Sequence, residues 1–361
     1  MQSVALDKVA GLIDGAVDVR RLPDAQQPDA LQPIRVPAGE LALYDPFTRY
    51  VATMPGGARL RLRTDSTRIT LQLSERRIAG PADTRSAWYD LFVDGTRVAR
   101  QRADGGATHD LETNSVAGDD TAAVTFAGLP TNDKQVELWL PQFASVRIRA
   151  LHIDDGATLR PWPDLRQRIV FHGSSITHCA EAAGPSDAWP AVAARLANVR
   201  HLNLGWAGSC LLSGLAARIV RDQPANAIVL KLGINVSDNA ALQERTFLDS
   251  AHAMLAIVRE KHPRVPIALV SPIFSPPRET SSSSGGLPLV RMRALLKDVA
   301  TTWQARGDTQ LHYLSGLDLF GEADLADLPD QLHPNAAGYL RMGERFHALM
   351  LAPGKPLALP R

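Results

Sequence analysis

The sequence predicts two domains: an antiparallel β-sandwich of jelly-roll type over residues 1–163, then an α/β domain over residues 164–361 with a parallel sheet between two helix layers. Two observations predict this division. Between residues 40 and 160, short segments alternate between apolar and polar residues, which is typical of half-buried strands. After Pro161-Trp162-Pro163, short apolar segments alternate with segments of helical length, which favours a parallel sheet covered on both faces.

Two-residue periodicity predicts the strands of the first domain. Leucine and arginine alternate from residue 59 to 63, which places leucines on one face of a strand and arginines on the other. The apolar segment 88–93 runs into Asp94-Gly95, a pair typical of a hairpin turn. In this domain, no long helix is predicted after the first 20 residues. The predicted strands are Arg59–Arg63, Arg68–Leu73, Trp88–Val93, Val136–Leu140 and Ser145–Arg149.

The second domain is predicted as alternating strands and helices, so its chemistry is expected at the C-terminal ends of the strands. The predicted strands are Arg168–His172, His201–Leu204, Ala227–Leu232, Pro266–Ser271 and Leu311–Ser315. The predicted helices are Trp189–Ala197, Leu211–Asp222, Thr246–Lys261, Leu289–Arg306 and Asn335–Leu351. The low-complexity segment Pro276–Gly286 follows the fourth strand. It is either a plain surface loop or a lid that helps recognise substrate.

Length, composition and charge set the general class. A chain of 361 residues suits two domains, and 45% hydrophobic with 21% charged residues is ordinary for a globular protein. The net charge of +1 excludes a global field that attracts nucleic acid or a membrane surface. No signal peptide or membrane span is recognised, and two cysteines imply no disulfide framework. A cytoplasmic protein acting on a small molecule is expected, and its oligomeric state is left open.

Two motifs at the first strand ends carry residues for acyl chemistry. Residues 171–177 read FHGSSIT, where glycine permits a sharp turn and Ser175 begins a helix with its hydroxyl exposed. Residues 203–208 read NLGWAG, where Gly208 lets a backbone N–H approach a substrate oxygen. Each motif alone is also compatible with an ordinary capped turn.

Two further motifs follow the third strand and precede the last helix. Asn235 ends the sequence Leu-Gly-Ile-Asn, and its side-chain amide can donate a hydrogen bond to a developing negative charge. Asp330 stands three residues before His333, a spacing at which a carboxylate can reach and orient an imidazole. The chain order Ser, Asp, His also fits α/β-hydrolases, but no G-x-S-x-G motif is present.

Together, these four motifs resemble the four blocks of the SGNH (GDSL-type) hydrolase superfamily. The resemblance covers about residues 164–361. It implies that Ser175 is the nucleophile, that Gly208 and Asn235 form the oxyanion hole with the Ser175 backbone N–H, and that Asp330 and His333 complete the triad. It also implies that neither a metal nor a cofactor is needed.

Two local features qualify this resemblance. The family's common Gly-Asp-Ser is Gly-Ser-Ser here, which makes Ser174 a minor rival nucleophile. The stretch Trp88–Gly95 is similar to the Gly-x-Asp-Leu-Tyr signature of an accessory β-sandwich found in related two-domain esterases, with Phe92 at the tyrosine position. The resemblance therefore extends to a two-domain form of the superfamily.

The predicted function is that of a serine esterase or acylhydrolase that cleaves a small or carbohydrate-like acyl ester through an acyl-enzyme. The first alternative is an acyltransferase that uses the same triad to move the acyl group onto an alcohol of a natural product. A second alternative, from another class, is a non-catalytic carbohydrate-binding protein on a hydrolase scaffold. Neither the acyl group nor the alcohol follows from the sequence.

Other residues near the predicted site have two readings each. Trp206 and His178 are predicted to contact substrate, although Trp206 is equally compatible with core packing. Cys179 and Cys210 are expected near the pocket, as small buried residues rather than a disulfide. His172 and His178 lack partners at zinc spacing, apart from Cys179, so no metal site is predicted.

Overall fold

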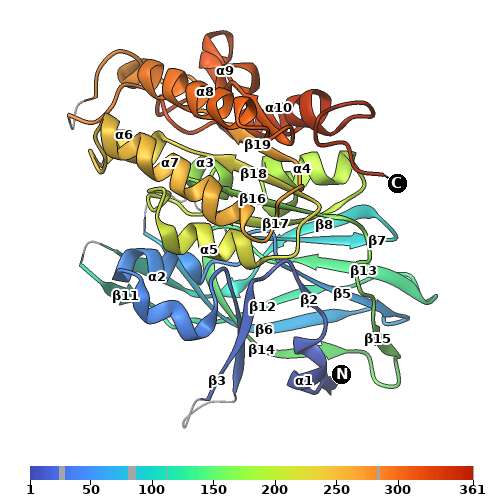
Figure 1. The fold of residues 1–361 in the computed structure, drawn as a ribbon. Coiled ribbons are helices and arrows are strands. Elements are labelled where there is room, and N and C mark those ends of the chain that lie inside the picture. The colour runs from blue at the N-terminus through green and yellow to red at the C-terminus, as the bar shows by residue number, and fades with distance from the viewer. Residues whose placement is uncertain (24–28, 80–86, 112, 283–284, 361) are drawn as a thin grey trace. The chain divides into compact units, whose positions relative to one another are not determined.

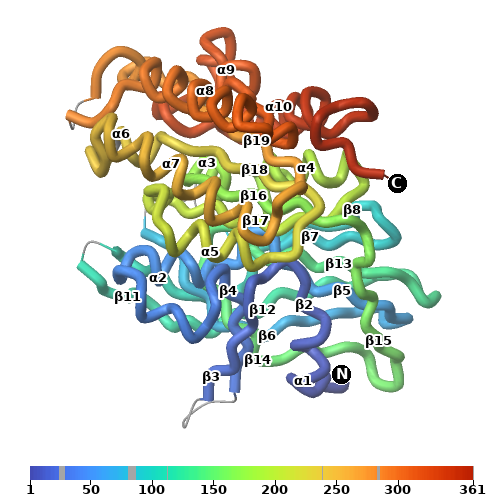
Figure 2. Tube along the Cα trace, in the orientation of Figure 1, coloured from blue at the N-terminus to red at the C-terminus, as the bar shows by residue number. Residues whose placement is uncertain are grey.

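The chain folds into two compact units in a computed structural model that describes residues 1–23, 29–79, 87–111, 113–282 and 285–360. The first unit contains Met1–Leu165 and Ala183–Ser186. The second contains Arg166–Ala182 and Asp187–Arg361. Figure 1 labels the helices and strands, and Figure 2 follows the same chain as a tube.

Two sheets make up the first unit. One has the strand order β11-β10-β6-β14-β4-β3, with β1 paired to β14 and β12 to β6 and β9. The other has the order β15-β5-β13-β7-β8, with β2 paired to β5. Their strands are β1 (Gln2–Val4), β2 (Ile13–Asp14), β3 (Asp18–Leu22), β4 (Ala30–Ile34), β5 (Arg59–Thr64), β6 (Ile69–Ile78), β7 (Trp88–Val93), β8 (Thr96–Arg102), β9 (Asp104–Gly105), β10 (Ala107–Asp110), β11 (Ser115–Ala117), β12 (Thr121–Phe126), β13 (Lys134–Trp139), β14 (Ala144–Ile153) and β15 (Leu159–Pro161). Short helices are α1 (Leu6–Ala10), η1 (Ala38–Leu43) and α2 (Pro46–Ala52).

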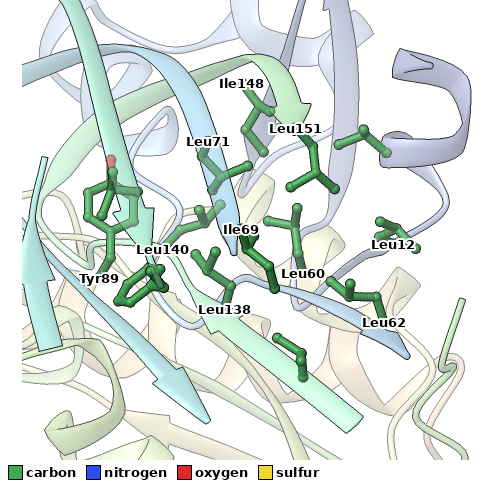
Figure 3. Close-up of a cluster of buried hydrophobic side chains, with 14 of the residues drawn as sticks. Leu12, Leu60, Leu62, Ile69, Leu71, Tyr89, Leu138, Leu140, Ile148 and Leu151 are labelled. Atoms are coloured by element: carbon green, nitrogen blue, oxygen red, sulfur yellow. The ribbon is translucent and has the colours of Figure 1, made fainter. Parts of the chain in front are cut away.

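The apolar residues of both sheets meet in one core, as a β-sandwich requires. Leu60 and Leu62 of β5 and Leu138 of β13 belong to the same buried cluster as Leu71 of β6 and Ile148 of β14. Figure 3 shows these side chains converging between the strands. The predicted sandwich is therefore confirmed, with one parallel pair, β6 and β10, among its otherwise antiparallel ladders over the described residues.

All five strands predicted in this half are present, and the hairpin after β7 forms as expected. Asp94 and Gly95 both have positive φ, 48° and 83°, as a type I′ turn requires. The arginine face of β5 differs from the prediction, because Arg59 and Arg61 are only 1% and 4% exposed. Both guanidinium groups pair with the buried carboxylate of Asp164, at 3.1 and 3.0 Å. Alternation correctly separates the two faces of this strand, but it does not show that the polar face is also covered.

Residues 183–186 group with the first unit because strand β7 binds them. The buried carboxylate of Asp90 accepts hydrogen bonds from Ser186 N at 3.1 Å and Ser186 Oγ at 2.6 Å. Arg100 of β8 pairs with both oxygens of Asp90, at 2.6 and 2.8 Å. Gly184 lies against the same guanidinium, where a Cβ would come within 2.4 Å of the Arg100 Cζ. Asp90, the aspartate of the Trp88–Gly95 stretch, is thus an anchoring residue of this unit.

A buried carboxyl in the sandwich makes its stability depend on pH. Burial raises the pKa of Glu75 to about 7, although the Tyr89 hydroxyl donates to it at 2.6 Å. The folded unit therefore holds a proton that the unfolded chain releases near pH 4.5, and stability falls as pH rises between these values. The free energy of unfolding of the unchanged protein changes with pH between these values. We expect Glu75→Gln to reduce this change by about 2–3 kcal/mol.

The measurement is the free energy of unfolding of both proteins between pH 4.5 and 8. The difference in unfolding free energy between the two proteins should change from pH 4.5 to about 7 and become constant above about pH 7. Glu322→Gln, the same chemical change at an exposed residue of the second unit, should leave the pH dependence of unfolding unchanged. A constant difference between Glu75→Gln and the unchanged protein would contradict the assignment.

The second unit is built on a parallel sheet with the order β17-β16-β18-β19-β20. Its strands are β16 (Arg168–Gly173), β17 (Arg200–Gly205), β18 (Ala227–Lys231), β19 (Ile267–Val270) and β20 (Leu311–Leu314). Its helices are α3 (Ser175–His178), α4 (Trp189–Leu196), α5 (Gly214–Asp222), α6 (Ile234–Asp238), α7 (Glu244–Arg259), η3 (Pro276–Arg278), α8 (Leu289–Ala305), α9 (Gly316–Leu319), η4 (Glu322–Asp327), α10 (Ala336–Phe346) and the π-helical turn η5 (His347–Leu351), while the short helix η2 (Pro185–Asp187) spans the boundary between the two units. The predicted α/β class is confirmed.

Strand order places the switch point of this sheet between β16 and β18. From β16 the chain moves to β17 on one side, whereas from β18 it moves to β19 on the other. Right-handed crossovers then put α4 on one face and α5, α7 and α8 on the other. In agreement, α4 packs against α10, α5 against α7, and α7 against α8. Ligands of such sheets bind at the C-terminal ends of the strands beside this point.

The predicted strands and helices of this half are all present, with changes at their ends. The last helix, predicted over 335–351, leaves α-helical geometry at Phe346 and continues as η5. The helix expected to begin at Ser175 is present as α3, whereas the short helices α6 and α9 were not predicted, because four or five residues are too few to show helical periodicity. Over the described residues, no helix combines the length and the apolarity needed to cross a membrane.

Candidate active site

Ser175 begins α3 just after strand β16, and two glycines allow this helix to lie close to the sheet. A Cβ on Gly173 would approach the Thr177 Oγ1 to 2.3 Å. A Cβ on Gly205, at the end of β17, would approach the His178 backbone N to 2.3 Å. Because neither position tolerates a side chain, the sequence fixes Ser175 at the C-terminal edge of the sheet.

Buried polar groups hold α3 in this place. The Asn203 amide donates to Thr177 O at 2.9 Å and accepts from Gly205 N at 2.8 Å. The Trp189 indole donates to Ile176 O at 2.9 Å. The carbonyl groups of this single turn are therefore satisfied by β17 and α4, which compensates for its lack of continuing helix. Asn203 belongs to the second motif, but no role was predicted for it. A polar residue inside an apolar strand is the feature of the sequence that could have indicated this structural role.

The Ser175 hydroxyl is hydrogen-bonded to His333, which is hydrogen-bonded to Asp330. Ser175 Oγ lies 2.8 Å from His333 Nε2, and His333 Nδ1 lies 2.7 Å from Asp330 Oδ2. A carboxylate can only accept, so Nδ1 carries a proton and Nε2 is the acceptor for the serine O–H. This is the polarity that a general base at Nε2 needs. The structure thus brings together the three residues predicted to act as nucleophile, base and acid.

Asp330 is held ionised in this arrangement. Partial burial opposes the charge, but hydrogen bonds from the His333 ring and backbone lower the pKa of Asp330 to about 2. Its Oδ1 accepts from Leu332 N at 2.9 Å and His333 N at 2.6 Å, which leaves Oδ2 for the ring. One carboxylate therefore shapes the backbone turn and orients the imidazole.

The Asp330–His333 turn is tied to two neighbouring segments. Gln331 has a φ of +60°, and the buried Ser275 hydroxyl donates to its carbonyl at 2.6 Å. On the other side, Asn335 caps α10 by accepting from Gly338 N at 3.0 Å. Because Gln331 lies between Asp330 and His333, Ser275 holds this turn through a contact that the sequence analysis missed. A serine between two proline-rich stretches gave no signal of this contact.

Ser275→Ala should therefore weaken catalysis without removing any reacting group. Loss of a buried hydrogen bond to a strained turn loosens the Asp330–His333 segment, and small misplacement of catalytic groups is costly. We expect kcat to fall about 10-fold, and KM to change less than 3-fold. Ester-hydrolysis kinetics measure both. Ser315→Ala, which removes the side-chain cap of α9, is the matched control and should leave kcat unchanged. Equal rates for the two variants would contradict the positioning role.

Gly208 sits in a tight turn after β17. Ser209 N donates to Trp206 O at 3.1 Å, and Gly208 has a φ of +69°, the conformation of the third residue in a type II turn. The Asn239 amide donates to Gly208 O at 3.3 Å and so fixes the orientation of the following peptide. A residue with a side chain would be strained here, in agreement with the need for glycine.

The amide of Asn235 has a fixed orientation. Its Oδ1 accepts from Cys210 N at 3.1 Å, which leaves the NH2 group as the end that can donate to a ligand. Strand register places Gly173 beside both Gly205 and Lys231, so the segments after β16, β17 and β18 are neighbours. The three predicted oxyanion donors therefore come from adjacent segments at the switch point.

The remaining predicted site residues are buried. The side chains of His178 and Trp206 are 0% and 2% exposed, and their contact with substrate stays a prediction. Cys179 and Cys210 are buried as thiols rather than joined in a disulfide, as the packing interpretation predicts. His172 Nδ1 donates to Leu204 O at 2.9 Å, and Cys210 Sγ lies 3.6 Å from its Nε2. Burial raises the pKa of Cys210 to about 12, so this thiol stays protonated.

The base of the Pro276–Gly286 loop is anchored. Arg293 of α8 donates to Glu279 at 2.7 Å and to Pro272 O at 2.9 Å. Ser282 donates to Ser237 O at 3.1 Å. Residues 283 and 284 lie outside the described residues. The lid interpretation of this loop stays a prediction.

Residues 166–350, more than half of the chain, match the GDSL-like lipase/acylhydrolase family. The chain belongs to this family. Residues 14–149 match a second family, the N-terminal domain of SsfX3. Both halves of the predicted resemblance are thus confirmed, and the family member is an SGNH-type esterase or acyltransferase. A search among curated proteins found no match.

Several solved structures resemble the chain over most of its length. The salicylyl-acyltransferase SsfX3 from a tetracycline biosynthetic pathway is 28% identical, with a TM-score of 0.78 and 92% of each chain covered. A GDSL-like lipase candidate from Bacteroides ovatus is 19% identical, with a TM-score of 0.73, covering 96% of this chain and 95% of that one. A family two carbohydrate esterase from Clostridium thermocellum, in complex with cellohexaose, is 17% identical, with a TM-score of 0.60 and coverage of 81% and 91%. The latter two are likenesses of fold.

Proposed function

We propose that the chain is a serine acylhydrolase that works through a covalent acyl-enzyme on Ser175. The observation that carries this proposal is the series of hydrogen bonds from Ser175 Oγ through His333 to Asp330, at 2.8 and 2.7 Å. His333 Nε2 takes the serine proton as Oγ attacks the ester carbonyl. The resulting oxyanion accepts hydrogen bonds from Ser175 N, Gly208 N and the Asn235 amide.

Collapse of this intermediate expels the alcohol. The C–O bond of the ester breaks, and His333 returns its proton to the leaving oxygen. A second nucleophile then loses a proton to His333 Nε2 as it attacks the acyl carbon. The bond between the acyl carbon and Ser175 Oγ breaks, and His333 returns the proton to Oγ, which restores the free Ser175 hydroxyl. With water as this nucleophile, the product is a carboxylic acid. Residues 164–361 are proposed as the catalytic domain and residues 1–163 as its accessory domain, in a cytoplasmic protein.

Acyl transfer is the second candidate function. The likeness to a salicylyl-acyltransferase, 28% identical over 92% of both chains, specifically favours it. In this case an alcohol replaces water in the second step, and the same triad moves the same proton. The proposed acyl donors are small acyl esters. The proposed acceptor is an alcohol on a carbohydrate or a natural product. Hydrolysis and transfer differ in which nucleophile reaches the acyl-enzyme.

An acyl-trapping experiment tests the proposal. The protein is mixed with p-nitrophenyl esters of acetate and salicylate, quenched in acid and digested for mass spectrometry. We expect an acyl adduct on the peptide that contains Ser175. The partition between acid and acylated alcohol, measured with added glycerol, glucose or a phenolic alcohol, separates hydrolysis from transfer. An adduct on another residue, or none under conditions of turnover, would overturn the covalent mechanism.

A further inference from the structure

A second carboxyl group lies beside the ring of His333. Glu181 Oε1 is 3.9 Å from His333 Nδ1, on the side of the ring that also faces Asp330. At this distance the contact is electrostatic rather than a hydrogen bond. Glu181 follows α3 by three residues, so it approaches the ring from the nucleophile segment, whereas Asp330 belongs to the ring's own turn. Glu181 and His333 both lie in the second unit.

Glu181 is held by a buried tyrosine. The Tyr339 hydroxyl of α10 donates to Glu181 Oε2 at 3.1 Å, and Tyr339 is fully buried. The Glu181 side chain is 23% exposed, compared with 52% for Asp330. Solvent therefore screens the charge of Asp330 more than that of Glu181. This half-enclosed carboxyl is placed to interact with a charge on the ring.

The charges around Glu181 couple its ionisation to the ring. Burial raises the pKa of Glu181, the His333 ring and the Tyr339 hydroxyl lower it, and Asp330 raises it. The titratable groups facing it are Asp330 and His333 before α10, Tyr339 on α10, and Cys179 at the end of α3. A proton on His333 therefore favours the ionised form of Glu181, and an ionised Glu181 favours a proton on His333.

We propose that Glu181 is a second acid partner of His333, a positioning residue that shares with Asp330 the positive charge which the ring gains during acyl transfer. This inference rests on the proposed function of Ser175 and His333. Asp330 fixes the ring's orientation and tautomer through its hydrogen bond. Glu181 adds a negative charge within the range of about 4–6 Å at which an opposite charge favours an ionised group. Tyr339 keeps that charge in place.

The acidic limb of the pH profile is the first test. With p-nitrophenyl acetate, kcat/KM is measured from pH 4.5 to 9 for the unchanged protein, Glu181→Gln and Glu344→Gln. Glu344 is an exposed carboxylate on α10, the helix that carries Tyr339, and serves as the matched control. We expect Glu181→Gln to move the acidic limb to lower pH by about half a unit, because the protonated ring loses a negative neighbour. The control should not move it.

The Asp330→Asn background is the second test. We expect Asp330→Asn to lower kcat/KM about 100-fold, less than the roughly 10⁴-fold that follows loss of the acid where no second carboxylate is near. Glu181→Gln should cost less than 3-fold alone and at least 10-fold in this background. The loss of a shared partner is non-additive in this way. Equal losses in the two backgrounds, with an unmoved acidic limb, would overturn the proposal.

Two further measurements keep the test decisive. In Ser175→Ala protein, the NMR titration of the His333 ring should have a lower midpoint when Glu181→Gln is added, whether or not any ester turns over. If Glu181→Gln does not fold, Tyr339→Phe takes its place, and a smaller shift in the same direction is expected. If neither variant changes the midpoint of the His333 titration, the role proposed for Glu181 is rejected and the proposed function of Ser175 is not affected. Full ester turnover by Ser175→Ala would instead reject the proposed function.

Discussion

Ser175→Ala is expected to lower kcat for p-nitrophenyl acetate by about 10⁴- to 10⁶-fold, the largest effect of any single substitution in this chain. The hydroxyl is the only group at that position that can form the acyl bond, and Oγ is the atom within 2.8 Å of His333 Nε2. Removing it leaves the fold intact, because alanine is compatible with the first position of α3. Burst-phase and steady-state kinetics, with intact-mass spectra, measure the loss.

The neighbouring serine provides the matched control for this prediction. Ser174 Oγ accepts from Ile176 N at 3.3 Å as the N-cap of α3, and its side chain is buried. Ser174→Ala should destabilise the protein by about 1 kcal/mol through loss of the cap. It should still form the acyl-enzyme. If Ser174→Ala abolished the adduct and Ser175→Ala retained it, the nucleophile would be Ser174.

Asn235→Asp should reduce kcat by about 10³-fold or more, at or above the upper end of the roughly 10²- to 10³-fold loss that is typical when one oxyanion donor is truncated. The substitution keeps an oxygen for the Cys210 N–H, which now donates to Asn235 Oδ1 at 3.1 Å. It replaces the donating NH2 by a second acceptor that carries charge. The developing oxyanion then meets a negative group instead of a hydrogen-bond donor.

The test compares kcat and KM of Asn235→Asp with those of Asn235→Ala. Asn132→Asp, the same change at an exposed residue of the first unit, is the control and should leave both constants unchanged. The aspartate variant should be the slower of the two at pH 8, and the gap should narrow as pH falls and the carboxylate is protonated. An aspartate variant as active as the unchanged protein would remove Asn235 from the oxyanion hole.

Much of the fold follows from local sequence patterns. Two-residue alternation predicts the strands of the first unit, because each carries one apolar face toward a shared core. In the second unit, each short apolar segment became a parallel strand. Ser175, Gly208 and Asn235 each follow such a strand, so a parallel register alone makes them neighbours. The motif spacing therefore contains most of the site.

Contacts between segments far apart in sequence could not be predicted. Glu181 meets His333 across 152 positions of chain only because α3 and the turn before α10 lie at one edge of the sheet. Ser275 reaches Gln331, and Asp90 reaches Ser186, for similar reasons. Each is a single polar residue without periodicity. Sequence patterns describe which face a residue occupies, whereas these roles depend on what the opposite segment presents.

The short turn from Asp330 to His333 has a consequence for how this enzyme tolerates change. Because Asp330 binds both the backbone and the ring of His333, the proposed acid and base are assembled within four consecutive residues. Insertions in other loops can alter the distance from this pair to Ser175, while the hydrogen bonds from Asp330 to His333 stay in place as long as Ser275 still binds the Gln331 carbonyl. The surrounding loops, and with them the accepted acyl groups, can therefore change while the proposed proton-transfer pair stays complete.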